Sequence, residues 1–246
     1  MSGSENLHER VPHLEKHRHR ELDFLQRNLS IPKVVLVGNP NVGKSLLFNT
    51  LSDFYVDVSN FPGTTIQIQK TRYNGHDVFD TPGIYGVSSF NEEECVARDI
   101  ILDADIVLNV VDGTHLERDL FLTQQLLDMG KKVTVLLNFM DEVKKLGIKI
   151  DTIRLANFLG VDVFAISAVE GVERETMDAA IRLAREGVQR KELHSVLHSK
   201  LTMVGSQAEA LLVLEGDEVI AGRHGVRADD RREELYVDRR NRVNYM

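Results

Sequence analysis

Tryptophan is absent from this 246-residue chain, and cysteine occurs once, at Cys95. A single thiol cannot form an internal disulfide, which excludes a disulfide-stapled fold and favours a reducing compartment. Long apolar runs are also missing, since none approaches the roughly 18–20 residues that a membrane-spanning helix needs. Residues 1–30 are polar and charged, so we expect no secretory signal and a soluble chain.

An excess of positive charge is missing as well. The chain has 30 Lys and Arg against 38 Asp and Glu, which gives a formal net charge of −8. Binding to nucleic acid or to an anionic membrane surface depends on Lys and Arg side chains that neutralise phosphates. We therefore expect no nucleic-acid partner for this chain.

Residues 1–30 differ in composition from the rest of the chain and contain four of its nine histidines. The stretch HLEKHRHRELDFLQRNL predicts a surface helix that ends before Pro32. Metal binding by His13, His17 and His19 is one hypothesis, because residues four apart lie on one face of a helix. A solvated extension without a ligand is the favoured alternative.

From residue 33 onward, short apolar runs alternate with helix-like segments. The run KVVLVG is typical of a strand buried on both faces, and Asn74-Gly75 is a strong hairpin signal. This alternation predicts an α/β fold with a mostly parallel six-stranded sheet, helices on both faces and one antiparallel edge strand. The expected strands are residues 33–38, 65–73, 76–81, 104–112, 131–138 and 161–167, and the expected helices are residues 44–52, 91–102, 116–130, 151–160 and 175–187.

The strands stop after about residue 188, and helix-like sequence follows. Residues 188–246 contain ten Lys or Arg and ten Asp or Glu, so this segment is electrically balanced. Helical stretches at 192–222 and 229–246 predict a small helical module, and the uncapped charged helix at the end predicts a cut from a longer protein. The expected division is an N-terminal extension at 1–30, a sheet domain at 31–188 and the helical module at 189–246.

The stretch GNPNVGKS, from Gly38 to Ser45, matches the phosphate-loop pattern G-x-x-x-x-G-K-[ST] and lies between a predicted strand and a predicted helix. Backbone N–H groups of such a loop bind phosphate, and the following helix adds its positive end. Lys44 is expected to reach the β- and γ-phosphates, and Ser45 to ligate Mg²⁺. A plain glycine turn before a helix would explain Gly38 and Gly43, but not the Lys-Ser pair.

The stretch DTPG follows the phosphate loop by about 40 residues and ends a predicted strand. Asp80 is expected to hold Mg²⁺ through water, and the N–H of Gly83 to meet the γ-phosphate. D-x-x-G alone is often only a turn, so its position carries the interpretation. The next residue, Ile84, stands where many GTPases place a glutamine that orients the attacking water, and isoleucine cannot donate or accept a hydrogen bond.

A base-recognition motif, NFMD, follows the strand-like run KKVTVLL. The Asp141 carboxylate can accept hydrogen bonds from N1–H and N2–H₂ of guanine, and adenine lacks both donors, so Asp141 would select GTP over ATP. Asn138 would brace neighbouring loops. A helix N-cap is the alternative role of Asp141. The stretch Ile166–Ala168 ends the last strand, where a backbone N–H can meet guanine O6.

Together these motifs resemble the Ras-like, translation-factor class of GTPases, and more narrowly the cytosolic amino-terminal region of ferrous iron transport protein B, FeoB. Four passages carry the narrower resemblance, GNPNVGKSLLFNTLS, VSNFPGTT, DTPGIYG and LLNFMDEVKKLGIKID. LLVLEGDEVI and RREELYVDRRNRV resemble the helical module of that family. The resemblance covers residues 33–246 and implies a Ras-like P-loop GTPase domain, then a GDI-like helical domain that leads to an absent membrane region.

The resemblance also implies two switch loops. Thr65 in FPGTT would close over the γ-phosphate and Mg²⁺, with Thr64 as an adjacent alternative. The first switch loop would run from 55 to 65 and the second from 83 to 90.

A monovalent-cation site is implied in the same way. Asn41 matches the residue that ligates K⁺ in potassium-activated relatives, and the carbonyls of Ser59 and Phe61 would complete the ion's shell. The family commonly has Gly, Trp and Ala where this chain has Ser59, Phe61 and Pro62, and Phe139 replaces a lysine found in many GTPases. Water would be placed by backbone groups of the first switch, with K⁺ supplying charge.

The expected site can be set out by residue. The nucleotide-binding residues are Gly38, Asn39, Pro40, Asn41, Val42, Gly43, Lys44, Ser45, Leu46, Gly63, Thr64, Thr65, Asp80, Thr81, Pro82, Gly83, Asn138, Phe139, Met140, Asp141, Ile166, Ser167 and Ala168. The catalytic residues are Thr65, Gly83 and Asn41, the Mg²⁺ ligands are Ser45, Thr65 and Asp80, and the candidate K⁺ ligands are Asn41, Ser59 and Phe61.

The leading hypothesis is a slowly hydrolysing GTP switch that controls Fe²⁺ uptake by a membrane transporter. Its expected ligands are GTP or GDP, Mg²⁺ and K⁺, and its expected partner is the transporter's own membrane domain. That places it at the cytoplasmic face of the cell membrane, with homo-oligomerisation left open. The alternative is a ribosome- or RNA-associated GTPase, against which the balanced segment 188–246 and the acidic net charge argue.

Overall fold

The computed structural model describes residues 31–52, 56–87, 91–189 and 191–245. The predicted N-terminal helix with His13, His17 and His19 lies outside these residues. Residues 32–246 form one compact unit, which is the part described below.

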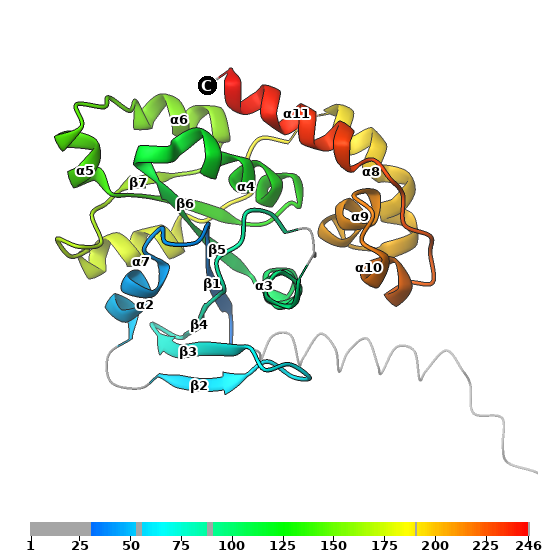
Figure 1. Ribbon diagram of the computed structural model, residues 1–246, viewed down its shortest axis with the longest axis horizontal. Coiled ribbons are helices and arrows are strands. Elements are labelled where there is room, and N and C mark those ends of the chain that lie inside the picture. The colour runs from blue at the N-terminus through cyan, green and yellow to red at the C-terminus, as the bar shows by residue number, and fades with distance from the viewer. Residues whose placement is uncertain (1–30, 53–55, 88–90, 190, 246) are drawn as a thin grey trace, which may run out of the picture. The chain divides into compact units, whose positions relative to one another are not determined.

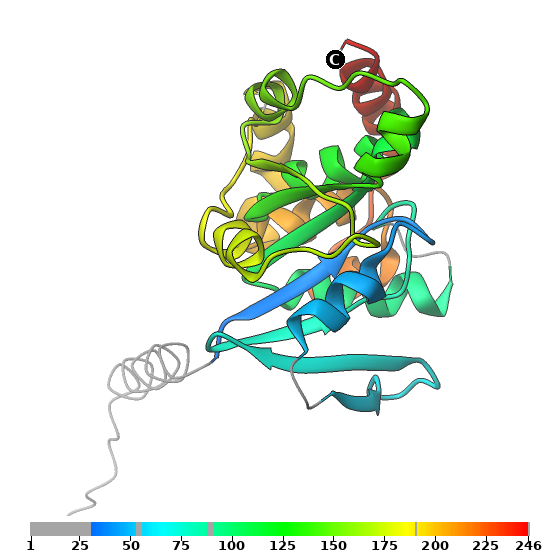
Figure 2. The ribbon, with the colours of Figure 1, turned by 90° about the vertical axis from the view of Figure 1, so that its left-hand side faces the viewer.

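One seven-stranded sheet organises the unit, with strand order β2-β3-β4-β1-β5-β6-β7 (Figure 1). The sequence predicted six strands, and the strand it missed is β2, which pairs along β3 at the edge of the sheet (Figure 2). All four residues of β2 are exposed, so no hydrophobic alternation marks it in the sequence. The strands are β1 (Lys33–Val37), β2 (Asp57–Asn60), β3 (Gln67–Tyr73), β4 (His76–Asp80), β5 (Ile106–Asp112), β6 (Val133–Asn138) and β7 (Val163–Ala165).

The antiparallel strand is β3, and it lies second from the edge, not at the edge as predicted, because β2 covers its outer side. Strands β4, β1, β5, β6 and β7 run parallel to one another. The predicted hairpin between β3 and β4 is present. Asn74 and Gly75 have φ of 44° and 79°, the left-handed conformations that a tight two-residue turn requires.

Two apolar layers cover the sheet. Side chains of β1 alternate between them, since Val35 and Val37 join one buried cluster while Val34 and Leu36 join the other. One layer contains α2 (Lys44–Leu51) and α7 (Arg174–Arg182). The other contains α3 (Glu92–Asp103), α4 (Leu116–Asp128) and α6 (Thr152–Leu159). The central strands therefore have no solvent face, which explains their unbroken apolar sequence.

Helix ends follow the expected capping chemistry in several places. The Asn91 side chain accepts a hydrogen bond from the Glu94 N–H at the start of α3. Gly130, with φ of 69°, follows the end of α4. The predicted helix at 175–187 is shorter in the structure, because Arg185 instead forms an antiparallel bridge with Val133. A short helix, α5 (Met140–Lys145), was not predicted.

The helical segment contains four helices, α8 (Lys191–Val204), α9 (Gln207–Leu214), α10 (Glu218–Arg223) and α11 (Arg232–Asn244). The first predicted helix, 192–222, is thus broken twice. Gly205 and Gly216 have φ of 79° and 87° at the two breaks, and each is followed by a capping residue, Ser206 and Asp217. Across the described residues, no helix is both long and apolar enough to cross a membrane.

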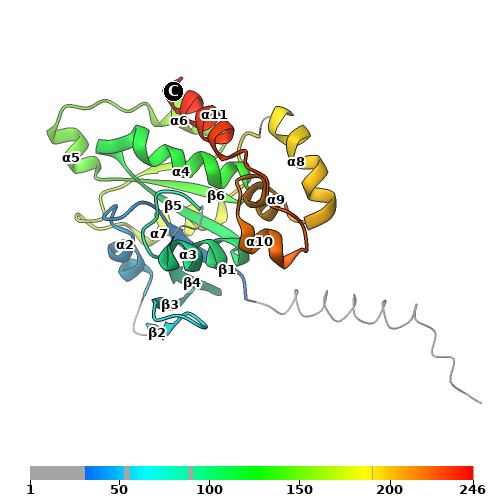
Figure 3. The ribbon, with the colours of Figure 1, turned by 45° about the vertical axis from the view of Figure 1, so that its right-hand side comes forward.

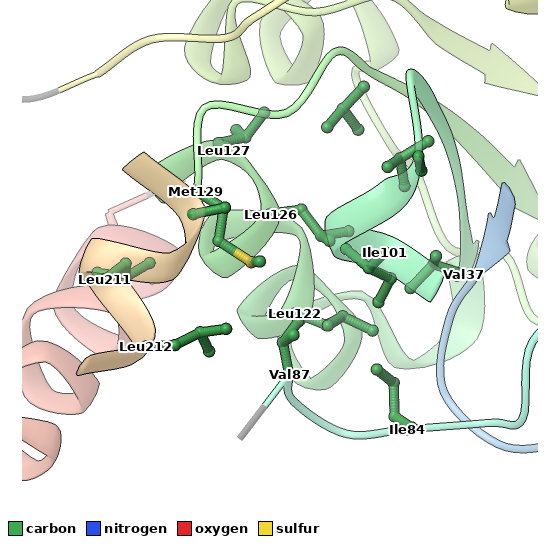
Figure 4. Close-up of a cluster of buried hydrophobic side chains, with 14 of the residues drawn as sticks. Val37, Ile84, Val87, Ile101, Leu122, Leu126, Leu127, Met129, Leu211 and Leu212 are labelled. Atoms are coloured by element: carbon green, nitrogen blue, oxygen red, sulfur yellow. The ribbon is translucent and has the colours of Figure 1, made fainter. Parts of the chain in front are cut away.

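Apolar packing continues from the sheet layers into this helical segment. Figure 4 shows Leu211 and Leu212 of α9 across from Leu126 and Met129 at the end of α4. Helix α11 turns back and packs along α4, while α8, α9 and α10 gather beside the sheet domain (Figure 3). The predicted boundary near residue 188 therefore crosses a continuous hydrophobic core.

Buried ion pairs join the same elements. Arg239 of α11 donates to Asp128 of α4 at 2.8 Å and forms an ion pair with Glu215 at 2.5 Å, and all three side chains are at least 97% buried. Arg242 also donates to Asp128. On the other side of the module, Arg98 of α3 pairs with Asp217 at 2.8 Å. Such pairs offset the cost of burying each charge only when both partners are present.

Replacing Arg239 with alanine should therefore destabilise the protein strongly. The change removes the cation that the buried carboxylates of Asp128 and Glu215 share, and we expect a loss of about 3–5 kcal/mol in unfolding free energy. Arg240→Ala is the matched control, because Arg240 is exposed on the same helix, and its effect should stay within about 0.5 kcal/mol. Urea unfolding followed by circular dichroism measures both, and equal midpoints for the two variants would contradict a stabilising role for the Arg239 pairs.

Candidate nucleotide-binding site

The four sequence motifs meet at one edge of the sheet. Gly38 follows β1, Asp80 ends β4, Asn138 ends β6 and Ile166 follows β7, and these four strands are parallel. Their carboxyl ends therefore point to the same side. Strand β1 lies between β4 and β5, which is the position where the strand order reverses and where ligands bind in open α/β sheets.

The phosphate loop adopts the conformation that an anion site needs. Asn41 and Gly43 have φ of 64° and 93°, so two of the three residues before α2 adopt left-handed backbone conformations. A Cβ atom at position 43 would lie 2.5 Å from the Asn138 amide nitrogen. Glycine is thus required at position 43 both by its backbone angle and by the close approach of Asn138.

Lys44 lies inside this loop and is 7% exposed. Its ammonium donates to the carbonyl oxygens of Gly38 at 3.1 Å and Asn39 at 2.9 Å. Burial lowers the pKa of Lys44, and the nearby carboxylates of Asp80 and Asp119 oppose that shift. The carbonyls of Gly38 and Asn39 and the nearby carboxylates of Asp80 and Asp119 therefore stabilise the ammonium group beneath the loop.

Ser45 and Asp80, two of the expected Mg²⁺ ligands, are joined by a hydrogen bond. The Ser45 hydroxyl donates to Asp80 Oδ2 at 2.7 Å, and Asp80 Oδ1 is buried with no hydrogen-bond partner among the described residues. Burial raises the pKa of Asp80, which the Ser45 hydrogen bond and Lys44 partly offset. An unpartnered carboxylate oxygen beside a hydroxyl is an oxygen donor set that fits Mg²⁺, directly or through its waters.

Among the described residues, no hydrogen bond joins Thr65, the third expected Mg²⁺ ligand, to Ser45 or Asp80. It is exposed on the turn between β2 and β3. Its neighbour Thr64 is tied into that turn, because its hydroxyl donates to the Phe61 carbonyl at 3.0 Å and accepts from the Ile66 N–H at 3.2 Å. Gly63 has φ of 80° in the same turn. The segment predicted as a loop thus contains strand β2 followed by a closed turn.

Gly83 lies directly against the phosphate loop. A Cβ atom at this position would come within 2.7 Å of Pro40 Cα and 2.8 Å of Pro40 N, so any larger residue would push the two loops apart. The following N–H, of Ile84, donates to the Gly38 carbonyl at 3.2 Å. Thr81, two residues before Gly83, is held by a 2.7 Å hydrogen bond from its hydroxyl to the Leu36 carbonyl. The DTPG motif and the phosphate loop therefore form one contact.

The side chain of Ile84 belongs to the hydrophobic core. It is 1% exposed and packs in the cluster that includes Leu122 and Val87 (Figure 4). The residue after the motif glycine therefore anchors the segment by its side chain and contacts the phosphate loop only by its backbone. This explains why an apolar residue is accommodated there, and it excludes Ile84 from water placement.

Asn138 joins three parts of the site. Its side-chain amide donates to the Val42 carbonyl at 2.9 Å and accepts from the Ala168 N–H at 2.9 Å. The predicted bracing role is thus visible in the geometry. Phe139 follows with φ of 62° as the N-cap residue of α5, which carries Met140 and Asp141.

Asp141 faces a cavity of about 640 Å³. The Ser167 hydroxyl donates to its Oδ1 at 2.9 Å and the Lys145 ammonium to its Oδ2 at 3.1 Å. The Ser167 hydrogen bond, followed by that of Lys145, lowers the pKa of Asp141, so the carboxylate is kept ionised. The cavity is lined by Met140, Asp141, Lys144, Lys145, Ala165, Ile166, Ser167 and Glu170.

A larger open cavity of about 960 Å³ lies in the helical segment, around residues 215–232. It contains none of the motif residues. The smaller cavity beside Asp141 contains motif residues and is the candidate base pocket.

The candidate K⁺ ligands are Asn41 of the phosphate loop and the residues Ser59 and Phe61 of the predicted first switch. Asn41 is exposed on the phosphate loop, and Ser59 is exposed in β2. Within the described residues, no hydrogen bond connects Asn41 with Ser59 or Phe61. The cation site therefore stays a prediction.

Sequence reasoning missed one layer of polar residues behind the site. In α4, whose sequence was interpreted only as a helix, Asp119 and Gln125 are each 1% exposed. Asp119 accepts from the Asn39 amide, and Gln125 accepts from the Val87 N–H at 2.7 Å while donating to Glu215 at 2.7 Å. Their polar type on a helix that faces the sheet was the available signal.

The parallel sheet, the phosphate loop with Lys44 and Ser45, the acidic strand end at Asp80 and the cavity beside Asp141 define a Ras-like P-loop GTPase domain. The profile of one protein family, ferrous iron transport protein B, matches residues 32–181. The chain therefore belongs to the ferrous iron transport protein B family.

The relatives give the extent of this likeness. The Fe(2+) transporter FeoB of Helicobacter pylori is 40% identical over 169 residues, which cover 65% of this chain and 26% of that protein. A crystal structure of a mutant S. thermophilus NFeoB bound to GDP has a TM-score of 0.76 and 28% identity, covering 87% of this chain and 98% of that one. NFeoB from S. thermophilus bound to GDP.AlF4⁻ and K⁺ has a TM-score of 0.73 and 27% identity, with 87% and 98% coverage.

The chain matches only part of each of these curated relatives. The chain spans about a quarter of the length of the first relatives that it matches. Residues 32–181 carry the family match, whereas the structural likeness extends over 87% of the chain.

Asp141→Asn should weaken GTP binding by about tenfold or more, because an amide oxygen replaces a charged acceptor for two guanine donors. ATP binding, weak at the outset, should not change. Glu142→Gln is the control, since Glu142 is the exposed neighbour on α5 and lies outside the base pocket. Isothermal calorimetry with Mg²⁺ present decides the matter, and unchanged GTP affinity in Asp141→Asn would remove Asp141 from base recognition.

Proposed function

We propose that this chain binds GTP with Mg²⁺ and hydrolyses it slowly to GDP and phosphate, as the regulatory domain of a ferrous iron membrane transporter. The observation that carries the proposal is the convergence of Lys44, the Ser45–Asp80 pair and the Asp141 pocket at one sheet edge. This arrangement offers a phosphate nest, a cation position and a base pocket in the order that a bound nucleotide requires.

Phosphate binding follows from the loop geometry. Backbone N–H groups of residues 41–45 and the N-terminal end of α2 would hold the phosphates, and Lys44 would turn from the loop carbonyls toward the β- and γ-oxygens. Mg²⁺ would neutralise charge on the phosphate oxygens beside Ser45 and Asp80. In the reaction a water oxygen bonds to the γ-phosphorus as the bond to the β–γ bridging oxygen breaks, and the water proton leaves with phosphate.

Slow turnover is supported by what the second switch lacks. Ile84 is buried, so no side chain at that position can orient the water. Backbone groups near Thr65 are the proposed replacement, once the first switch closes over the nucleotide. Because closure must first be reached, we expect a basal rate on the order of 10⁻⁴ to 10⁻² s⁻¹.

Strand β2 and the turn after it are suited to a switch. The strand has four residues, all exposed, and pairs only with β3. An edge element with so little buried surface can leave the sheet at low cost. GTP would favour the arrangement that brings Thr65 to Mg²⁺, and GDP would release it.

Two polar connections lead from the second switch to the helical segment. The Val87 N–H reaches Glu215 through Gln125, and Arg98 in α3, the helix after that switch, pairs with Asp217. A shift of the DTPG segment would therefore change contacts at the ends of α9 and α10. We propose this as the route by which nucleotide state reaches the rest of the transporter.

The iron-transport assignment rests on family membership. The curated relatives are Fe(2+) transporters about four times longer than the matched region. We propose that a membrane domain of the same protein is the partner, that this domain lies at the cytoplasmic face of the membrane, and that Fe²⁺ is cargo of the membrane part. The acidic net charge of −8 disfavours the ribosome- or RNA-associated alternative, and filter binding with ribosomal RNA at physiological salt separates the two.

K⁺ should stimulate hydrolysis if Asn41 binds a monovalent cation. Replacing Na⁺ with K⁺ should raise the GTPase rate tenfold or more, equivalent to about 1.4 kcal/mol of transition-state stabilisation. Asn41→Ala should remove this response and leave GTP affinity largely intact, because the phosphate nest is made of backbone N–H groups. Phosphate release is measured with GTP and with ATP as control, and equal rates in the two salts would exclude the cation site.

The first switch should be protected by the γ-phosphate. Limited proteolysis should cut residues 57–65 faster with GDP than with a nonhydrolysable GTP analogue, since only the γ-phosphate and Mg²⁺ recruit Thr65. Thr65→Ala is the matched variant, and it should be cut equally fast in both states. Mass spectrometry of the fragments locates the cut, and a wild-type protein cleaved at one rate in both states would rule out nucleotide-dependent ordering here.

A further inference from the structure

A buried carboxylate, Asp119 of α4, lies behind the phosphate loop and is 1% exposed. Its Oδ1 accepts from the Asn39 side-chain amide at 2.5 Å and from Arg118 Nε at 2.7 Å. Its Oδ2 accepts from the Asp112 N–H, at the end of β5, at 2.9 Å. One side chain thus connects the phosphate loop, the end of a central strand and a helix.

Asn39 passes this contact on to the phosphate-binding lysine. Its side chain is bound to Asp119, while its backbone carbonyl accepts from the Lys44 ammonium at 2.9 Å. Asn39 is itself 1% exposed. A displacement of its side chain would therefore move a carbonyl that holds Lys44.

The carboxylate also fixes which way the Asn39 amide points. An ionised carboxylate only accepts hydrogen bonds, so the amide must turn its NH₂ group toward Asp119. Asn39 Oδ1 then points elsewhere, and it is buried with no donor among the described residues. A buried acceptor without a donor is costly, and it is the pattern of a position that is completed when a ligand or its water arrives.

We propose that Asp119 is a positioning residue for nucleotide binding, which acts through Asn39 to hold the phosphate loop around Lys44. This inference rests on the proposed function, because it assigns a further residue to the same site. The effect of Asp119 should appear in nucleotide affinity and should depend on the side chain at position 39.

A double-mutant cycle tests the dependence. Asp119→Ala and Asn39→Ala should each weaken GTP and GDP binding about tenfold or more, with kcat changed less than about threefold. The double variant should bind no more weakly than the weaker-binding single variant, because both changes break the same connection. Calorimetry with Mg²⁺ and each nucleotide, at a temperature where every variant is folded by circular dichroism, supplies the affinities.

A swapped pair gives a second test that does not depend on alanine. Asn39→Asp alone places two carboxylates against each other and should weaken GTP binding. Adding Asp119→Asn restores a donor–acceptor pair between the two positions, and its oxygen can still accept from the Asp112 N–H. The swapped double variant should therefore bind GTP at least tenfold more tightly than Asn39→Asp.

Asp128→Asn serves as the stability control, because Asp128 is an equally buried carboxylate of α4 that faces Arg239 and Arg242. It should lower the melting temperature without changing GTP affinity. Additive losses in the alanine cycle, no rescue by the swapped pair, or wild-type affinity in Asp119→Ala would each overturn the positioning role. A wild-type protein that binds no GTP would instead refute the proposed function itself.

Discussion

A lysine ammonium buried beneath a backbone loop is the constraint on which the nucleotide site depends. Burial lowers the pKa of Lys44, so the charge is kept only if acceptors and carboxylates surround it. The loop carbonyls provide the acceptors, and strand β4 and helix α4 provide the carboxylates. Parallel pairing of β1 with β4 brings Asp80 to the loop, and α4, packed on the same sheet, brings Asp119. The fold therefore places two carboxylates near one ammonium group.

The sequence was sufficient for the parts of the site that are local. The phosphate loop, DTPG and NFMD each lie within a few residues, and their glycines and strand context can be identified without tertiary knowledge. Asp119 could not be found in this way, because its role depends on Asn39, 80 residues earlier. Strand β2 was missed for a different reason, since it is defined by backbone pairing with β3 and buries no side chain. The breaks at Gly205 and Gly216 carried readable signals, a glycine followed by a capping residue.

The helical segment shares more with the sheet domain than its composition suggests. Several of its charged residues form ion pairs that cross to α3 and α4, such as Arg98 with Asp217 and Arg239 with Asp128. Leu211 and Leu212 extend the apolar layer that covers the sheet. The division near residue 188 is therefore a change in architecture along the chain, and the hydrogen bonds from Val87 through Gln125 to Glu215 cross it.

Helix α4 has contacts on nearly every side. Its polar residues serve different neighbours, with Asp119 toward the phosphate loop, Thr123 toward Asn109 of β5, and Asp128 toward α11. Most of its 13 residues are buried. A helix with one solvent-exposed face can accept substitutions on that face without changes elsewhere in the protein. A substitution in α4 must instead fit two packed surfaces at once. Sequence drift in this helix should therefore be slow and correlated, with replacements at Asp119 and Asp128 following changes in the loop and in α11, respectively.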